Sequence, residues 1–443
     1  MSASLLFIFV ISYFILLLSV AWYTSRNSTN ESFFIGNRNS NWMLVSFGMI
    51  GTSLSGVTFV SVPGTVGAQA FSYFQVVVGY FLGYIIVAFV LLPLYYKMQL
   101  TSIYNYLLNR FGFSAYKTGS FFFIVSRVLG ATARLYLVIN VLQIFILNNM
   151  GVPFWLTSFI ILLMIILYTF EGGVKTIVFT DTLQTTFMIA GLLICIGFVM
   201  HAMNFSITDS LNALHLKGLS NTWNTDIKSS GFFLKQVIGG AFITIGMTGL
   251  DQEMMQKNIS VQRLKDSQKN MMTFSVIMVL VNLLFLFLGG ILYIFAQSKG
   301  ITAAGDDLFP TVALNYMPSF VSVVFIIALI SALFPSADGA LTALTSSFCI
   351  DILGMQRNQQ LTEKAKKRKR MIVHFTFAII FFICIMVFKW IDDKSIIGII
   401  LTIAGYTYGP LLGLFGFGIF TKRVLKENAW TTIVCVVAPI ICY

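Results

Sequence analysis

Apolar stretches of about twenty residues recur along this chain, and they constrain its fold more than any other feature. A helix needs about 20 such residues to cross the hydrocarbon core of a bilayer. Of the 443 residues, 57% are hydrophobic and only 10% are charged. We therefore expect an all-α polytopic membrane protein. The eleven full candidates are 4–24, 43–63, 72–96, 115–147, 153–170, 177–203, 231–256, 271–297, 317–349, 371–390 and 396–420.

The first and last apolar segments need separate treatment. Segment 4–24 is too long for the apolar part of a signal peptide and lacks a basic start and a small-residue cleavage site, so we expect a retained helix. Segment 429–443 falls below the usual span of about 17–25 residues. We interpret it as an incomplete last helix, which gives about twelve transmembrane helices and predicts that the native C-terminus is missing.

Basic residues are distributed unevenly between the predicted loops. The net charge of +12 would suggest nucleic acid as a partner of a soluble protein. Here, placing the N-terminus outside puts 20 basic residues in inside loops and 5 in outside loops. This bias follows the positive-inside rule and predicts a cell (inner) membrane protein with its N-terminus outside. No nucleic-acid partner is expected.

The sequence offers no signature of an enzyme, a cofactor site or a disulfide framework. The five cysteines lie in apolar segments without CxxC spacing, which is typical of small core residues. None of the three histidines stands in a catalytic pattern. Loops are short apart from 204–230 and 298–316, both predicted outside, so we expect a single membrane domain over 1–443.

Two carboxylates lie deep inside apolar segments: Asp181 in 177–203 and Asp338 in 317–349. A charge in hydrocarbon is costly unless something pairs with it, so such residues usually mark an ion or substrate path. If the two approach each other, they repel unless a cation or proton lies between them. This predicts a second cation site or a shared proton; the alternative is that each acid pairs separately with an Arg or a hydroxyl.

Two apolar segments are interrupted by small and polar residues, at 51–56 and at 246–249. Interruptions at matching places in two halves indicate an inverted-repeat transporter with a site near the bilayer midplane. An unwound turn frees carbonyl oxygens, and such backbone is tolerated at that depth only where it lines a cavity. The alternative is close helix packing through small residues.

Six segments, in order along the chain, resemble the sodium:solute symporter family. The first is similar to the sialic-acid transporter branch of the family in particular. The segments are TSLSGVTFVSVPG (52–64), LTSIYNYLLNRFG (100–112), YTFEGGVKTIVFTDTLQ (168–184), DQEMMQKNISVQRLKDSQKN (251–270), GDDLFPTVALNYMP (305–318) and GYTYGPLLGLFGFGIFTKR (405–423).

The resemblance implies a leucine-transporter (LeuT) type fold, a five-plus-five inverted repeat with one extra N-terminal helix. The extra helix would be 4–24, repeat one about 43–203 and repeat two about 231–420, with 429–443 as the incomplete last helix. It also implies solute uptake driven by sodium through alternating access.

The resemblance further assigns candidate cation ligands. The main sodium site would take the carbonyls of Gly51, Leu54 and Ala332 and the hydroxyl of Ser336. The family often has two adjacent hydroxyl residues here, whereas this chain has Pro335 before Ser336; Pro335 should also kink its helix. The second cation or proton site would use Asp181, with Asp338 and Gly339 in place of serines of the sialic-acid branch.

Candidate substrate contacts come from three segments. The resemblance assigns Ser53, Ser55 and Thr58, and Tyr73, Phe74 and Gln75 could face the same pocket. Arg127 and Arg134 are seven residues apart and share a helix face; the alignment puts Gly130, between them, at the position of the branch's carboxylate-binding arginine. Arg134 could still bind a solute carboxylate in bidentate fashion, or it could neutralise Asp181 or Asp338.

We therefore expect a sodium-coupled secondary active symporter that imports a small polar solute. The arginines favour an organic anion such as sialic acid or a monocarboxylate, with a sugar or neutral amino acid as alternatives. The expected partners are the sodium ion, the solute and the lipid bilayer, with no cofactor. A transporter-like sensor domain and a proton-coupled or inactive relative remain alternative interpretations.

Overall fold

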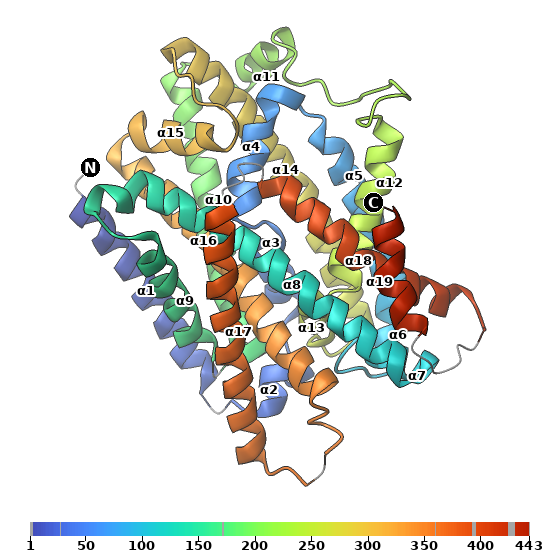
Figure 1. The fold of residues 1–443 in the computed structure, drawn as a ribbon. Helices are drawn as coiled ribbons and strands as arrows, with labels where there is room; N and C mark the ends of the chain where they lie inside the picture. Colours follow the sequence, from blue (N-terminus) through green and yellow to red (C-terminus); the bar gives the residue numbers. More distant parts are fainter. Residues whose placement is uncertain are drawn as a thin grey trace.

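The computed structural model describes residues 3–26, 28–170, 172–358, 360–391, 396–423 and 430–442. Over these residues the chain is helical, and each of the twelve predicted segments forms one helix or a pair of helices (Figure 1). In chain order these are α1 (Ala3–Ser25), α3 and α4 (Trp42–Ser53, Gly56–Gln69), α5 and α6 (Tyr73–Ile86, Leu92–Lys97), α8 (Phe113–Leu142), α9 (Phe154–Thr169), α10 (Gly173–Ala202), α12 and α13 (Phe233–Thr244, Gln252–Ile259), α14 (Leu264–Lys299), α16 (Ser319–Ser347), α17 (Glu363–Ile391), α18 (Ile396–Phe420) and α19 (Trp430–Cys442).

Length and apolar composition identify the helices able to cross a membrane. Among the described residues seven helices meet both conditions, and two bent pairs raise the number to nine. The bent pairs are α3 with α4 and α12 with α13. α9, with 16 residues, is a shorter apolar helix. The chain is therefore a multi-pass membrane protein, as its sequence predicts.

Both predicted interruptions are present. Leu54 and Ser55 leave helical geometry between α3 and α4, and the two helical stretches on either side are bent by 54°. In the second pair a π-helical turn, η5 (Ile245–Gly249), follows α12, and the chain bends by 64° before α13. The side chain of Asp251 caps α13 by accepting hydrogen bonds from the backbone N–H groups of Glu253 and Met254.

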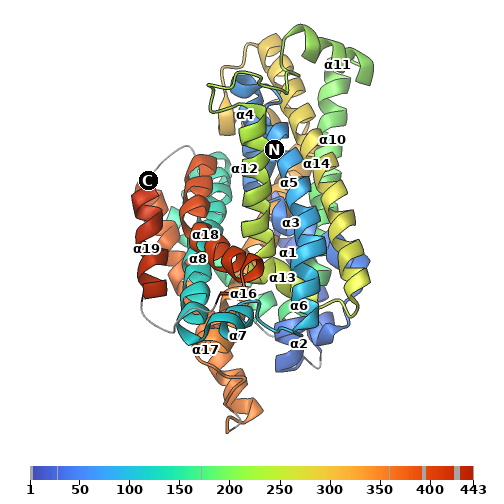
Figure 2. The same cartoon turned by 90° about the vertical axis from the view of Figure 1, so that its right-hand side faces the viewer.

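Short helices mark the two ends of the molecule. α11 (Ile207–Leu216) and α15 (Leu308–Asn315) lie at one end, while α2 (Asn30–Ile35) and α7 (Asn105–Phe111) lie at the other (Figures 1 and 2). The first two belong to the loops predicted outside and the last two to loops predicted inside. The structure thus confirms which loops share an end.

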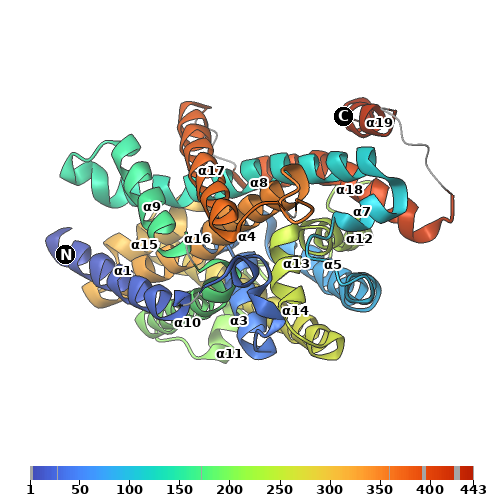
Figure 3. The ribbon, with the colours of Figure 1, turned by 90° about the horizontal axis from the view of Figure 1, so that it is seen from below.

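α16 forms the centre of the packing. It contacts α10, α8, α3 and α17, and Figure 3 shows it between α8 and α17 on one side and α3 and α10 on the other. Every residue from Ala328 to Ser347 is buried. The helix continues through Pro335 without a break. Asp338 therefore lies in the fully buried part of α16, where an unpaired charge would be most costly.

Candidate functional site

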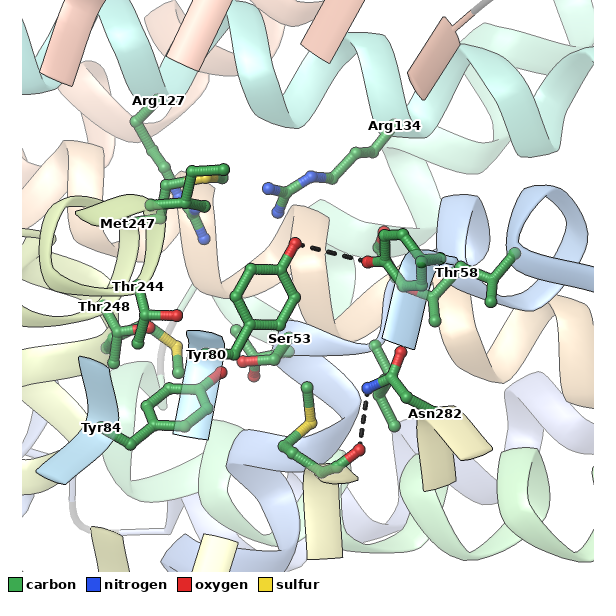
Figure 4. A pocket seen from close by; sticks show the side chains of 18 residues that line it. Ser53, Thr58, Tyr80, Tyr84, Arg127, Arg134, Thr244, Met247, Thr248 and Asn282 are labelled. Carbon is green, nitrogen blue, oxygen red and sulfur yellow. Dashed lines mark hydrogen bonds between the residues drawn. The ribbon is translucent and has the colours of Figure 1, made fainter. Parts of the chain in front are cut away.

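A cavity of about 130 Å³ lies where the break between α3 and α4 meets α5, α8, α12 and α14. Both interrupted helix pairs contribute to its wall. Its polar lining consists of Thr52, Ser53, Ser55, Thr58, Tyr73, Tyr80, Tyr84, Arg127, Arg134, Thr244, Thr248 and Asn282 (Figure 4). Apolar side chains such as Val62, Ile243 and Met278 complete it. A concave site with a few convergent polar groups is the usual form of a small-molecule site.

The hydroxyl residues predicted on either side of the first break all reach this cavity. Ser53 ends α3, Ser55 stands in the break and Thr58 lies in the first turn of α4. Because the helix stops at Leu54, side chains from both halves turn toward the same space. The sequence-based placement of these three residues is therefore consistent with the structure.

On α5 only one of the three predicted residues lines the cavity. Tyr73 does so together with Tyr80, and their phenol oxygens lie 3.4 Å apart. Phe74 is not part of the lining. Gln75 is fully buried elsewhere: its side chain donates to the carbonyl of Ser72 and accepts from the backbone N–H of Asn224. The geometry therefore places Gln75 as an anchor for the loop between α11 and α12.

The two arginines of α8 both point into the cavity, but their charges are used differently (Figure 4). Arg127 is buried and forms ion pairs with Glu253 and, at 3.6 Å, with Asp251. Arg134 has no ion pair among the described residues. Gly130, between them, faces open space, since a Cβ there would meet no atom within 4 Å. Within the described part of the chain, Arg134 therefore lines the cavity without an acidic partner.

Asp181 is neutralised by a residue that sequence analysis placed elsewhere. The Lys257 ammonium lies 2.6 Å from Oδ2 of Asp181 and 2.5 Å from Oγ1 of Thr52. Lys257 is one of the 20 basic residues that the sequence analysis assigns to inside loops, and for this residue the assignment is wrong: the chain bends by 64° before α13, and Lys257 of α13 is buried. Because Lys257 neutralises Asp181, the alternative that Arg134 could do so is wrong.

Asp338 has a separate partner. Its Oδ2 accepts a 2.8 Å hydrogen bond from the phenol of Tyr168, at the end of α9. The two acids therefore have different partners: a hydroxyl for Asp338, and for Asp181 a lysine, which neither interpretation of the sequence includes. Each carboxylate also has a second oxygen, Oδ1, and neither Oδ1 has a hydrogen-bond partner among the described residues. The same is true of the side chains of Gln184 on α10 and Thr342 on α16.

The predicted main sodium position lies between the end of α3 and the middle of α16. A Cβ on Gly51 would lie 3.3 Å from Cγ of Pro335, so the two helices are in direct contact here. In the described part of the chain no backbone N–H bonds to the carbonyl of Gly51 or Leu54. The Ser336 hydroxyl donates to the carbonyl of Leu333, which leaves its oxygen lone pairs available. Free oxygens of this kind suit a hard cation.

Comparison with known proteins identifies the chain at this point. Residues 33–435 match the family described as the Sodium:solute symporter family. The chain belongs to this family.

Relatives within the sodium:solute symporter family are distant but align over most of the chain. The sodium/sialic acid symporter SiaT of Proteus mirabilis is 23% identical over 96% of this chain and 86% of its own length. The sodium-coupled monocarboxylate transporter 1 of Mus musculus is 26% identical over 91% of this chain and 66% of its own length. The sodium/glucose cotransporter 1 of Ovis aries is 21% identical over 95% and 68%.

Solved structures show the same architecture. A Na⁺-coupled sialic acid symporter in a substrate-bound, outward-open state superimposes with a TM-score of 0.85 at 20% identity, covering 98% of this chain and 96% of its own. A nucleobase-cation-symport-1 transporter in a closed conformation gives 0.58 at 11% identity, covering 91% and 83%. The protein therefore has the predicted LeuT-type symporter fold.

Sequence analysis of this symporter missed the buried charges of α13 and two of the three cavity tyrosines of α5, Tyr80 and Tyr84. Glu253 and Lys257 are four residues apart and so share a helix face, directly after a predicted interruption that could redirect it. That spacing was the available signal. Tyr73, Tyr80 and Tyr84 recur at intervals of seven and four, which also defines one face.

Proposed function

We propose that this symporter imports a small organic anion together with sodium, across the cell inner membrane and with its N-terminus outside. The observation that carries the choice of an anion is the Arg134 guanidinium, which lines the cavity without an ion pair among the described residues. Arg127, by contrast, is already matched by Glu253 and Asp251. A guanidinium in a partly dry site is the natural partner of a carboxylate, which it can bind through two parallel hydrogen bonds.

The remaining lining suits a solute with hydroxyl or other polar groups. Ser53, Ser55 and Thr58 offer hydroxyls on one wall, while Tyr80 and the amide of Asn282 lie on others. A hydrogen-bonding site of this kind rejects analogues that leave its polar groups unpaired. The relatives named for sialic acid and monocarboxylate transport support an anionic solute, and we extend this to the present chain.

Sodium coupling follows from the position of the break between α3 and α4. The proposed main sodium site consists of the carbonyls of Gly51 and Leu54 together with Ala332 and Ser336 of α16. Gly51 and Leu54 lie within two positions of Ser53, which lines the solute cavity as Ser55 does. An ion that orders this turn also positions those hydroxyls. By linkage, solute must raise the affinity for sodium by the same factor as sodium raises that for solute.

Orientation and domain organisation are further parts of the proposal. Removing the buried Lys257 from the count leaves nineteen basic residues in inside loops against five outside, which still supports an outside N-terminus. We keep one membrane domain with repeats at about 43–203 and 231–420. The protein would act as a transporter and not as an enzyme, with sodium, solute and lipid as partners.

The decisive experiment measures thermal stability of the purified full-length protein in sodium and in potassium, with carboxylates, sugars and amino acids as candidate solutes. We expect a carboxylate to stabilise the protein in sodium only, since a ligand that binds the folded state raises its unfolding temperature. Uptake of that carboxylate into proteoliposomes would then require an inward sodium gradient. Stabilisation by sugars alone, or equally in potassium, would contradict the proposal.

A further inference from the structure

We propose that the ammonium group of Lys257 permanently occupies the second cation position of this symporter, so that sodium binds only at the main site. The inference rests on the proposed sodium coupling and specifies its stoichiometry. Its starting point is a contact: the carboxylate predicted to hold a second ion, Asp181, is held instead by a side chain of the same molecule.

The surroundings of the Lys257 nitrogen are those of a bound cation. Oδ2 of Asp181 lies at 2.6 Å, Oγ1 of Thr52 at 2.5 Å and Oε1 of Glu253 at 3.7 Å. These oxygens come from α10, α3 and α13, so the ammonium connects three helices. All the side chains are almost completely buried. A lysine at this depth is favourable only because its charge is paired.

Gly339 of α16 provides the space for this arrangement. A Cβ at Gly339 would overlap the carboxylate of Glu253 and lie 3.2 Å from the Lys257 nitrogen. Serines of the sialic-acid branch correspond to Asp338 and Gly339 here. Gly339 supplies no side-chain oxygen, while Asp338 bonds to Tyr168. Gly339 thus removes one side-chain oxygen at the place where a tethered cation is gained.

The occupied contact at Asp181 opposes a second sodium ion. Oδ2 of Asp181 already lies 2.6 Å from the Lys257 ammonium, and both side chains are buried. A sodium ion at Asp181 would have to displace an ammonium that cannot leave the protein. Displacing it would leave a buried charge without its partner, which is strongly unfavourable. Lys257 therefore fills the position in every state of the transport cycle.

The test is equilibrium binding of radioactive sodium to the purified full-length protein, without any solute. We expect about one ion per wild-type molecule and about two in Lys257→Met, because that change removes the ammonium and leaves the Asp181 carboxylate free. The additional ion should disappear in Lys257→Met/Asp181→Asn. Lys235→Met is the matched control, since Lys235 is exposed and bonds only to the nearby carbonyls of Ile227 and Ser229; it should bind sodium like the wild type.

Two sodium ions in the wild type, or no additional ion in Lys257→Met, would overturn the inference and leave sodium coupling intact. Sodium bound only after Lys257→Met would support the inference but contradict the proposed main site. No sodium in either protein would overturn both. If Lys257→Met does not fold, Lys257→Gln/Glu253→Gln keeps the net charge of the cluster and serves the same comparison, with the same outcomes deciding.

Discussion

The phenol of Tyr168 on α9 donates a 2.8 Å hydrogen bond to Oδ2 of Asp338 on α16. Oδ1 of the same carboxyl has no side-chain or backbone hydrogen-bond partner of good geometry among the described residues. The bond from Tyr168 joins a peripheral helix to the most buried stretch of the protein. A buried carboxylate without any partner is costly, so the bond has a clear role in stability.

Tyr168→Phe should therefore destabilise the protein by about 1–3 kcal/mol, the cost of leaving a buried acceptor unsatisfied. The measurement is the unfolding temperature in detergent, in sodium and in potassium. Tyr316→Phe provides the control, because Tyr316 is 47% exposed. Equal unfolding temperatures for wild type and Tyr168→Phe would show that the Asp338 carboxyl does not depend on this bond.

The ion pair between Arg127 and Glu253 predicts non-additive mutations. Arg127→Met leaves Asp251 buried without its cation and Glu253 with only Lys257, at 3.7 Å, and should cost about 3–5 kcal/mol. Arg127→Met/Glu253→Met removes both members of the closer pair and should be less destabilised than the sum of the two single changes. Denaturant or thermal unfolding of the four proteins gives the coupling. Simple additivity would argue against a direct interaction.

Two glycines at similar depth should respond in opposite ways to alanine. Gly339→Ala places a methyl group against the Glu253 carboxylate, and we expect a loss of about 1–3 kcal/mol from overpacking together with weaker sodium dependence. Gly130→Ala meets open space within the helix α8. There we expect a gain of a few tenths to about 1 kcal/mol from helix propensity. Reversal of this order in unfolding temperature would contradict the packing around Lys257.

Removal of the Arg134 charge from the cavity should weaken recognition of the anion. Arg134→Gln should weaken binding of the carboxylate about 10- to 100-fold, the loss of one charge-assisted contact of about 1.5–3 kcal/mol, without lowering sodium binding. Arg263→Gln is the control, because Arg263 is exposed. Solute-dependent stabilisation of the same size in wild type and Arg134→Gln would exclude the proposed contact.

Ser336→Ala should weaken sodium dependence with little effect on the unfolding temperature in potassium.

An acid at the end of the molecule that carries α11 and α15 gives a pH dependence. Asp306 lies in the turn η6 (Gly305–Asp307), and burial raises the pKa of its carboxyl above the ordinary value. The folded state then binds a proton more tightly than the unfolded state, so the stability from this group falls as pH rises through the interval between the two pKa values. Asp306→Asn should be more stable than wild type near neutral pH and equal to it at lower pH. A constant difference across the pH range would contradict this.

The apolar segments and the two interruptions could be predicted because each depends on local sequence. Twenty apolar residues must form a helix in lipid. A run of small and polar residues, such as 51–56, interrupts a regular helix. The partners of the buried charges could not be predicted in the same way. The assignment of Lys257 to a loop depended on where α13 turns, and that turn is set by packing against α16 and α3. Tyr168 and Asp338 are 170 residues apart, a separation at which no periodicity is informative.

The bend before α13 has a consequence for how such a protein can change its cargo. α13 carries Met254, which touches the solute cavity, next to Glu253 and one turn from Lys257, which hold the buried ions in place. Altered specificity built on α13 would disturb energy coupling at the same time. Tyr80 on α5 and Asn282 on α14 line the cavity but belong to neither buried ion pair. New solutes are therefore most accessible to evolution, and to engineering, through those two helices.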